Sequence, residues 1–287
     1  MYQSDVAPLE RVLMKHPRDA WVSPQRVAEQ WQALNYLDPP DYDAACRESD
    51  ALAALLESLG SVVDWMPGDD IGMDSVYQRD ASLVCNAGAI LARMGKELRS
   101  REPEAIGRQY PELGMRVLGS IEAPGTLEGG DVTWLAPDTL AVGRSYRTNA
   151  EGISQLRTLL GKDVEVIEVP MPHWRGRSEV FHLMSILSPL AEDLLLAYSP
   201  LLPIPFHEEL LARGFEIVEV PDHEFELACN VLATAPRVAV AIDGFPETSR
   251  RMEAAGVEVH TYPGADLSIK GTGGPTCLTR TLERAIA

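Results

Sequence analysis

The chain has 287 residues, 45% of them hydrophobic, so it can bury a large core as one big domain or two smaller ones. Its net charge of -18 disfavours nucleic acid and anionic membranes as partners and favours a cationic small molecule. No apolar run approaches the length of a membrane span, and the N-terminus lacks the basic and apolar regions of a signal peptide, so we expect a cytoplasmic protein.

Four cysteines are dispersed along the chain, and no two of them form a CxxC pair. This spacing argues against a disulfide framework and against a zinc finger. We therefore expect reduced thiols, and we interpret Cys46, Cys85 and Cys229 as packing residues.

The first predicted elements are a strand at Arg11–Lys15 and two helices. Ser23 and Pro24 mark the start of one helix, with the serine as N-cap and the proline in the first turn. The second helix runs from about residue 43 to residue 59, with apolar side chains along one face, and Gly60 ends it.

A pattern of helix, glycine, alternating strand and proline then recurs along the chain. The glycines that end the five helices are Gly60, Gly114, Gly161, Gly214 and Gly256. Such a recurrence indicates one supersecondary unit used five times.

Each repeat continues into an apolar strand pair, and one conspicuous polar residue stands near the start of each pair. These residues are Asp80, Glu128, His182, Asn230 and Cys277. If five similar units close around an axis, equivalent strand ends converge on it. Two acids, an imidazole, an amide and a thiol would then face one another, as in a catalytic site.

The stretch around Cys277 presents a thiol on an unusually bare backbone. Gly271, Gly273 and Gly274 lack side chains, so a ligand can approach the main chain closely, and Pro275 fixes the entry angle. The spacing of residues 278–286 predicts a helix, which would place the thiol near a helix N-terminus and favour the thiolate.

The ordered motifs DSVYQRD, LEGGDV, GRSYRTNAEG, FHLMS and GGPTCLT resemble the guanidino-group-modifying enzymes of the pentein superfamily, most closely the dimethylarginine dimethylaminohydrolases. The resemblance covers residues 10 to 280, approximately. It implies an α/β fold, a five-bladed pseudo-symmetric propeller of ββαβ repeats, with residues 1–287 as one catalytic domain. It also implies a small guanidino substrate and neither a metal nor a cofactor, and it leaves open whether the chain forms a homodimer.

The resemblance implies a role for seven residues. Cys277 would be the nucleophile, His182 the general acid and base, and Glu128 the carboxylate that orients the histidine. Asp80 would hold the guanidinium, Asp74 would contact the polar end of the substrate, and Arg99 and Arg147 would bind its carboxylate.

The reaction itself calls for these residue types. A guanidinium carbon is a poor electrophile because its charge is delocalised, so attack requires a strong nucleophile such as a thiolate and fixed negative charge that positions the cation. Expulsion of an amine requires a proton donor, and water must then be activated by a base. One histidine can serve both steps.

Several of these residues also have a purely structural interpretation. His182 lies in an apolar run, where a histidine is often a core residue, and Glu128 lies in a Glu-Gly-Gly-Asp turn sequence. Asp74 and Asp80 could serve only in helix caps or turns. Asn230 could form hydrogen bonds only with backbone groups near the axis of the five units. Arg147 precedes a capping-box pattern, and the charges around Arg99 suggest an exposed helix.

Three features limit the assignment of a substrate. Arg79 precedes Asp80, a pair that resembles arginine deiminases and amidinotransferases, whereas Met184 stands where those enzymes carry a second guanidinium-binding aspartate. The segment from Pro170 to Arg177 is long enough to form a lid. The favoured reaction is hydrolysis of a C–N bond of methylated arginine to citrulline and an amine. Arginine deiminase, amidinotransferase and a non-catalytic sensor of a cationic amino acid remain alternatives.

Overall fold

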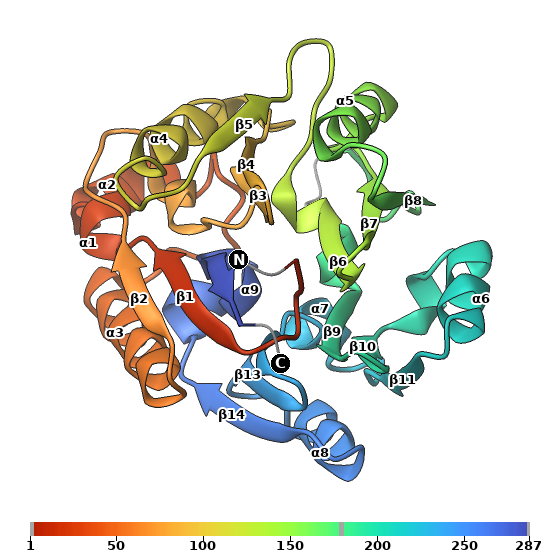
Figure 1. Ribbon diagram of the computed structural model, residues 1–287. Helices are drawn as coiled ribbons and strands as arrows, with labels where there is room; N and C mark the ends of the chain where they lie inside the picture. Colours follow the sequence, from red (N-terminus) through yellow and green to blue (C-terminus); the bar gives the residue numbers. More distant parts are fainter. Residues whose placement is uncertain (1–2, 178–180, 286–287) are drawn as a thin grey trace.

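Five small sheets surround a central axis in a computed structural model of the chain, which describes residues 3–177 and 181–285 (Figure 1). Each sheet has three strands. The five sheets are β15–β1–β2 (Thr279–Arg284, Leu9–Met14, Val62–Trp65), β3–β4–β5 (Ser82–Cys85, Gly88–Leu91, Val117–Ser120), β6–β7–β8 (Val132–Ala136, Thr139–Arg144, Glu165–Pro170), β9–β10–β11 (Leu187–Ala191, Leu194–Ala197, Glu216–Glu219) and β12–β13–β14 (Leu232–Ala235, Val238–Ile242, Glu258–Tyr262).

The blades share one connection pattern. The first two strands of each blade pair antiparallel, and the third returns parallel to the second after a helix. The connecting helices are α3 (Tyr42–Ser58), α4 (Glu102–Gln109), α5 (Ala150–Leu160), α6 (Ile204–Ala212) and α8 (Pro246–Ala254), and they form the outer rim (Figure 1). The predicted α/β propeller of five ββαβ repeats is therefore confirmed.

Glycine ends each connecting helix for a conformational reason. The five predicted glycines all have φ between 75° and 97°, a left-handed conformation that a side chain disfavours. The recurrence seen in the sequence is thus one helix-terminating turn repeated in each blade.

The ring is closed by the two ends of the chain. Strand β15 pairs antiparallel with β1, with Thr279 opposite Met14 and Arg284 opposite Leu9. Residues 278–286 were predicted to be helical. This prediction is wrong for residues 279–284, which form β15, and residue 286 lies outside the described residues. The two threonines and the leucine of β15 suit a buried strand beside β1.

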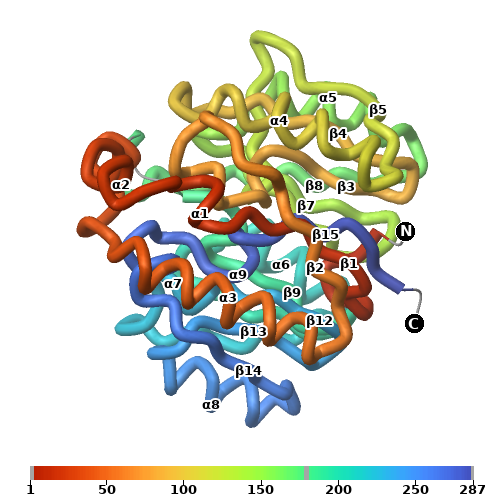
Figure 2. The backbone as a smooth tube through the Cα atoms, turned by 90° about the vertical axis from the view of Figure 1, so that its left-hand side faces the viewer, coloured from red at the N-terminus to blue at the C-terminus, as the bar shows by residue number. Residues whose placement is uncertain are grey.

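Short helices lie in the connections within and between the blades. They are α1 (Pro17–Ala20), α2 (Pro24–Gln30), η1 (Met73–Val76), η2 (Glu97–Arg99), η3 (Gly129–Asp131), η4 (Leu183–Ser185), η5 (Ser199–Leu201), α7 (Phe225–Ala228), η6 (Ala265–Ile269) and α9 (Pro275–Leu278). The predicted N-cap is confirmed, since Ser23 Oγ accepts a hydrogen bond from the Arg26 amide. Figure 2 shows α2 and α7 on the opposite side of the molecule from both chain ends.

The core consists of apolar clusters between neighbouring blades rather than one central mass. Strands β9 and β10 are buried along their whole length. Cys46, Cys85 and Cys229 are buried, as expected of packing residues. Within the part of the chain that the structure describes, no helix combines the length and apolar character that crossing a membrane requires.

Candidate active site

The five polar residues singled out in the repeats all precede the first strand of their blade, so the propeller brings them to one place. Asp80, His182, Asn230 and Cys277 line a cavity of about 640 Å³, which residues of α7 also border. Glu128 lies fully buried next to His182. The predicted convergence of equivalent strand ends is therefore observed.

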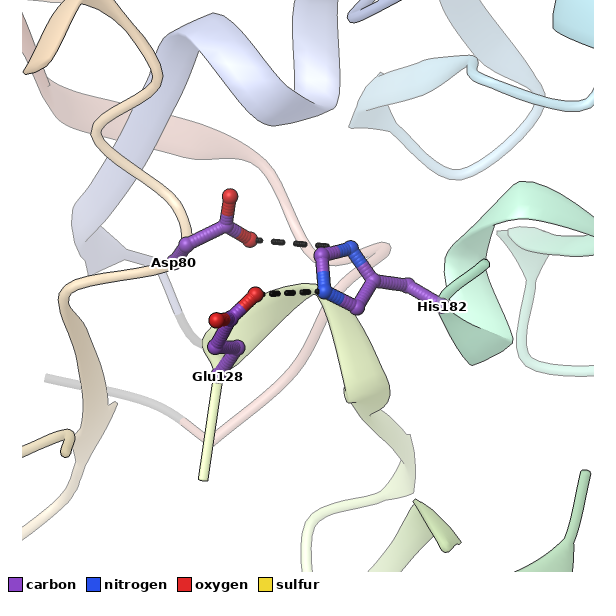
Figure 3. A group of neighbouring side chains, drawn as sticks. All are labelled: Asp80, Glu128 and His182. Carbon is purple, nitrogen blue, oxygen red and sulfur yellow. Dashed lines mark hydrogen bonds and ion pairs between the residues drawn. The ribbon is translucent and has the colours of Figure 1, made fainter. Parts of the chain in front are cut away.

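Glu128 holds the imidazole of His182 from behind. Its Oε2 lies 2.8 Å from His182 Nε2 (Figure 3). Arg147 Nη1 donates to both carboxylate oxygens at 3.2 Å, and the amides of Gly95 and Lys96 donate to Oε1. Burial raises the pKa of Glu128, but the hydrogen bond and charge of His182 and the charge of Arg147 hold that pKa well below its usual range. The carboxylate is therefore ionised although it is buried.

The surroundings of His182 favour its protonated form. The second ring nitrogen, Nδ1, lies 3.9 Å from Asp80 Oδ1 (Figure 3). Burial lowers the pKa of His182, but Asp80, Asp131 and Glu128 outweigh burial and raise the pKa to about 9. An imidazolium is ready to donate a proton at neutral pH.

Asp80 is fixed by a glycine that tolerates no side chain. Its Oδ1 accepts from the Gly130 amide at 3.0 Å, and its Oδ2 accepts from Arg99 Nη1 at 2.6 Å. A Cβ at Gly130 would lie 2.4 Å from His182 Nδ1 and 2.8 Å from Asp80 Oδ1. Glycine at position 130 is therefore required because His182 and Asp80 approach it closely, and not only because the Glu-Gly-Gly-Asp sequence suits a turn.

The thiol of Cys277 lies in α9 and is partly exposed to the cavity. Its Sγ accepts a hydrogen bond from Asn230 Nδ2 at 2.9 Å, while Asn230 Oδ1 accepts from the Thr276 amide at 3.1 Å. A Cβ at Gly274 would lie 2.7 Å from Asn230 Oδ1, so glycine is required there too. Asn230 thus contacts the sulfur, a contact that the sequence analysis did not anticipate.

The expected preference for thiolate is wrong for the free protein. Burial and the nearby charge of Asp80 raise the pKa of Cys277 to about 11, against the smaller effect of the Asn230 hydrogen bond. The helix α9 has only four residues, too few for its dipole to offset that burial. Cys277 is therefore a neutral thiol when the cavity holds no cation.

Arg99 is buried, contrary to the exposed helix expected from its charged neighbours. Its guanidinium forms a bidentate pair with Glu102, at 2.8 and 2.7 Å, and also binds Asp80. Burial raises the pKa of Glu102 to about 7, and Arg99 opposes that rise. Arg99 thus holds Asp80 in place, and a role in binding the substrate carboxylate stays a prediction.

The remaining predicted residues also line the cavity. Asp74 Oδ2 accepts from Lys96 Nζ at 2.7 Å, and Lys96 also donates to the Leu34 carbonyl. Lys96 is a cavity cation that the motifs did not single out. The proposed contacts of Asp74 and Arg147 with the substrate's amino-acid end stay predictions.

Apolar side chains also line the cavity. Met184 is buried beside His182, and Trp174, Phe181 and Phe225 form an aromatic wall. Trp174 belongs to the segment expected to form a lid. The site therefore combines the charged groups around Asp80 and His182 with a cluster of aromatic rings, which Arg175 and Glu226 also border.

Asp80, Glu128 and His182 place their ligand atoms within 4.8 Å of one another, the one such group among the described residues. A metal ion there would displace the proton of His182 and lie beside Arg99 and Arg147, which already bind these carboxylates. The donor set is therefore better matched to proton transfer than to binding a metal ion.

A family model described as arginine deiminase matches residues 73–203 and 204–284. The chain belongs to the arginine deiminase family. Among its relatives, the dimethylarginine dimethylaminohydrolase of Pseudomonas aeruginosa is 29% identical over 248 residues, which are 85% of this chain and 91% of the relative. The enzyme of the same name from Streptomyces coelicolor is 32% identical over 69% of this chain and 72% of its own length. The arginine deiminase of Mycobacterium tuberculosis is 27% identical over 71% of this chain and 59% of its own length.

Solved structures agree with this family and with the pentein fold. The dimethylarginine dimethylaminohydrolase of Pseudomonas aeruginosa, solved as a complex with citrulline, has a TM-score of 0.75 and 26% identity, covering 95% of this chain and 98% of that one. The N-terminal domain of a cyanobacterial arginine dihydrolase has a TM-score of 0.81 at 20% identity, covering 96% and 97%, and shows the fold alone. The pentein resemblance is thus confirmed, and this family member is a guanidino hydrolase of the superfamily.

Proposed function

We propose that the protein hydrolyses a C–N bond of an arginine-like guanidine through a covalent intermediate on Cys277, and that N-methylated arginine, giving citrulline and an amine, is its substrate. The observation that carries this proposal is one cavity that presents a thiol, a carboxylate for a cation, and an imidazolium held by a buried carboxylate.

The first step activates the sulfur. A guanidinium beside Asp80 adds a positive charge next to Cys277, which lowers the pKa of the thiol and releases its proton to solvent. The Asn230 amide already donates to the sulfur and stabilises the thiolate that forms. The cationic substrate therefore generates its own nucleophile.

The thiolate then attacks the guanidino carbon and forms a C–S bond. The protonated His182 gives its proton to the departing nitrogen, the C–N bond breaks, and a thiouronium cation and a neutral amine result. His182 is now neutral, and Glu128 keeps its ring oriented.

Water completes the cycle. Neutral His182 takes a proton from water, and the hydroxide adds to the thiouronium carbon. The C–S bond breaks and returns the thiolate, while the oxygen loses its remaining proton to solvent, where the released amine takes one up. The products are citrulline and an alkylammonium ion. Once the site holds no cation, the Cys277 thiolate takes back a proton from solvent, and the enzyme regains its neutral thiol and its protonated His182.

Met184 supports an alkylated guanidine over arginine. The N–H groups of an unsubstituted guanidinium form a fork that carboxylates accept in pairs, and Asp80 can accept on one edge only. A thioether accepts hydrogen bonds weakly, but it packs well against methyl groups. Deimination of unmodified arginine is the second candidate, because the matching family model and several relatives carry that name.

Product analysis on a panel of guanidines tests the proposal. The panel contains arginine, monomethylarginine, dimethylarginine, agmatine and guanidinoacetate, with citrulline and released amine measured for each. We expect dimethylarginine or monomethylarginine to be turned over fastest, and agmatine poorly because it has no carboxylate. A preference for arginine would move the assignment to a deiminase, and transfer of the amidino group to an added amine would move it to an amidinotransferase. No turnover of any guanidine, with binding retained, would leave a sensor.

A further inference from the structure

A second cluster of charged residues lies on the other side of the ring, toward the chain ends. It consists of Asp5, Arg280 and Arg284, together with Arg79, which also reaches the catalytic cavity, and each is at most 7% exposed. A small cavity there is lined by Asp5, Arg280 and Arg284, and it shares no lining residue with the catalytic cavity. The proposed reaction uses neither Arg280 nor Arg284.

The one carboxylate of this cluster is already fully engaged. Asp5 forms a bidentate pair with Arg79, at 3.2 Å for both bonds, and also accepts from Thr133 Oγ1 and the Trp134 amide. Burial raises the pKa of Asp5, but the charge and hydrogen bonds of Arg79 lower it to about 2. Asp5 therefore balances one of the three guanidinium charges.

The other two arginines have only backbone carbonyls as partners within the described residues. Arg280 Nη1 donates to the carbonyls of Arg79 and Ser82, and Arg284 Nη2 donates to the Ala233 carbonyl at 2.9 Å. The Nε atoms of both arginines are buried and have no hydrogen-bond partner among the residues that the structure describes. Burial lowers the pKa of each to about 10. Among the described residues, neither guanidinium therefore has a carboxylate as a hydrogen-bond partner, and the charge of Asp5, which acts on both, is already paired with Arg79. Two buried positive charges that share so little negative charge are costly unless an anion accompanies them.

The size of the small cavity decides which anion fits. Its volume is about 20 Å³. One water requires roughly 10 to 15 Å³ by the same measure, so the space accepts a single small particle and excludes a sulfate, phosphate or carboxylate. We propose that this cavity binds a halide ion, chloride under ordinary conditions, held by the guanidinium groups of Arg280 and Arg284.

Such an ion would also affect the segments that carry Asp80 and Cys277. Arg280 binds the carbonyls of Arg79 and Ser82, which flank Asp80, and it lies three residues beyond Cys277. The Arg79 amide also donates to the Cys277 carbonyl at 3.1 Å. Fixing Arg280 therefore stiffens the two segments that carry Asp80 and the thiol. Halide binding itself does not depend on the proposed reaction.

Thermal unfolding of the full chain in different sodium salts at matched ionic strength tests this proposal. We expect the melting temperature to rise with chloride or bromide, to saturate, and to exceed that in gluconate or sulfate by a few degrees. The ³⁵Cl resonance should broaden on addition of the protein, and excess bromide should reverse the broadening. Equal melting temperatures in all four salts, with no broadening, would show that the cavity holds only water and would overturn the proposal.

Paired variants locate the ion. Arg284→Met removes one of the two unbalanced charges and should abolish the chloride-specific rise, whereas Arg250→Met, at an exposed arginine that pairs with Glu247 on α8, should keep it. If Arg284→Met does not fold, anomalous scattering from wild-type crystals soaked in bromide decides the question. A bromide peak beside Arg280 and Arg284 supports the site, and peaks confined to the surface reject it.

Discussion

At the scale of single residues, the ionisation of Cys277 decides how the proposed site would work. The thiol has a pKa of about 11, and the neighbouring His182 has a pKa of about 9, so both hold a proton near neutral pH. A resting thiol is less open to oxidation and adventitious alkylation than a thiolate. The protein would therefore combine a protected nucleophile with activation by its cationic substrate.

Asn230 should set the reactivity of that thiol. Asn230→Ala removes the donor to Sγ, so we expect kcat to fall about ten- to a hundred-fold with a smaller change in KM, as expected for one charge-assisted hydrogen bond. The rate of Cys277 alkylation against pH should shift to higher pH as well. Asn230→Asp places a negative charge beside the sulfur and should shift the pH profile of Cys277 alkylation to still higher pH. Alkylation profiles identical to that of the wild type in both variants would make Asn230 a structural residue.

His182 should make stability depend on pH. Its pKa is raised from an ordinary 6.5 to about 9, so its contribution to stability is complete below about pH 6.5 and is lost as pH rises through about 9. We expect wild type to lose up to roughly 3 kcal/mol of unfolding free energy over this range. His182→Asn should lose less, as measured by denaturant unfolding at both pH values. An equal loss in the two proteins would show that the imidazole is not protonated in the fold.

Met184 should determine which guanidine is preferred. We expect wild type to favour methylated arginine over arginine by about ten- to a hundred-fold in kcat/KM, because an N–H facing sulfur in a dry pocket loses its water without an equivalent partner, at about 1 to 3 kcal/mol. Met184→Asp should shift the ratio toward arginine. Measuring kcat/KM for both substrates in both proteins checks this, and a ratio that the substitution leaves unchanged would contradict it.

At the scale of elements, two glycines should separate catalysis from stability. A Cβ at Gly130 would collide with His182 and Asp80, so Gly130→Ala should reduce kcat by at least about a hundred-fold. Gly161 ends α5 at φ 81° with nothing within 4 Å of a Cβ, so Gly161→Ala should cost about 1 to 2 kcal/mol of stability and leave kcat unchanged. Activity and melting temperature of both variants are measured. Equal loss of activity in the two would refute the distinction.

The order of elements was predictable because each helix ends at a glycine whose conformation no other residue adopts easily. Strand β15 could not be predicted in this way, since Leu278, Leu282 and Ile286 have the spacing of one face of a helix. Thr279–Arg284 forms a strand because it pairs with β1, from the other end of the sequence, and this long-range pairing overrides local periodicity. The four-residue α9 (Pro275–Leu278) precedes the predicted helix and shares only Leu278 with it.

At the scale of the whole molecule, the residues of the site were easier to predict from the sequence than the ion pairs and hydrogen bonds that join them. Cys277, His182, Glu128 and Asp80 stand at equivalent positions of a repeat, so a closed ring had to bring them together. The partners of Arg99 and Arg147 lie in other segments, and their ion pairs with Asp80, Glu102 and Glu128 depend on tertiary packing. The bond from Asn230 to the sulfur likewise joins two blades.

The charge of the whole chain agrees with this organisation. A net charge of -18 attracts cations over long range, and in the proposed function Asp80 would hold the guanidinium at close range. On the chain-end side of the ring, two arginines, Arg280 and Arg284, and one carboxylate, Asp5, line the small cavity. The sign of the charge is thus reversed locally in that cavity.

The covalent intermediate is the central claim, and mass spectrometry of protein quenched in acid during turnover of methylated arginine tests it most directly. We expect a substrate-derived adduct on the peptide that contains Cys277. In His182→Ala both its formation and its hydrolysis should slow, because His182 protonates the departing nitrogen and then activates water. Cys277→Ser should be folded, inactive and free of adduct. Turnover by Cys277→Ser, or turnover by wild type with no adduct on Cys277 under any quench time, would contradict the proposed mechanism.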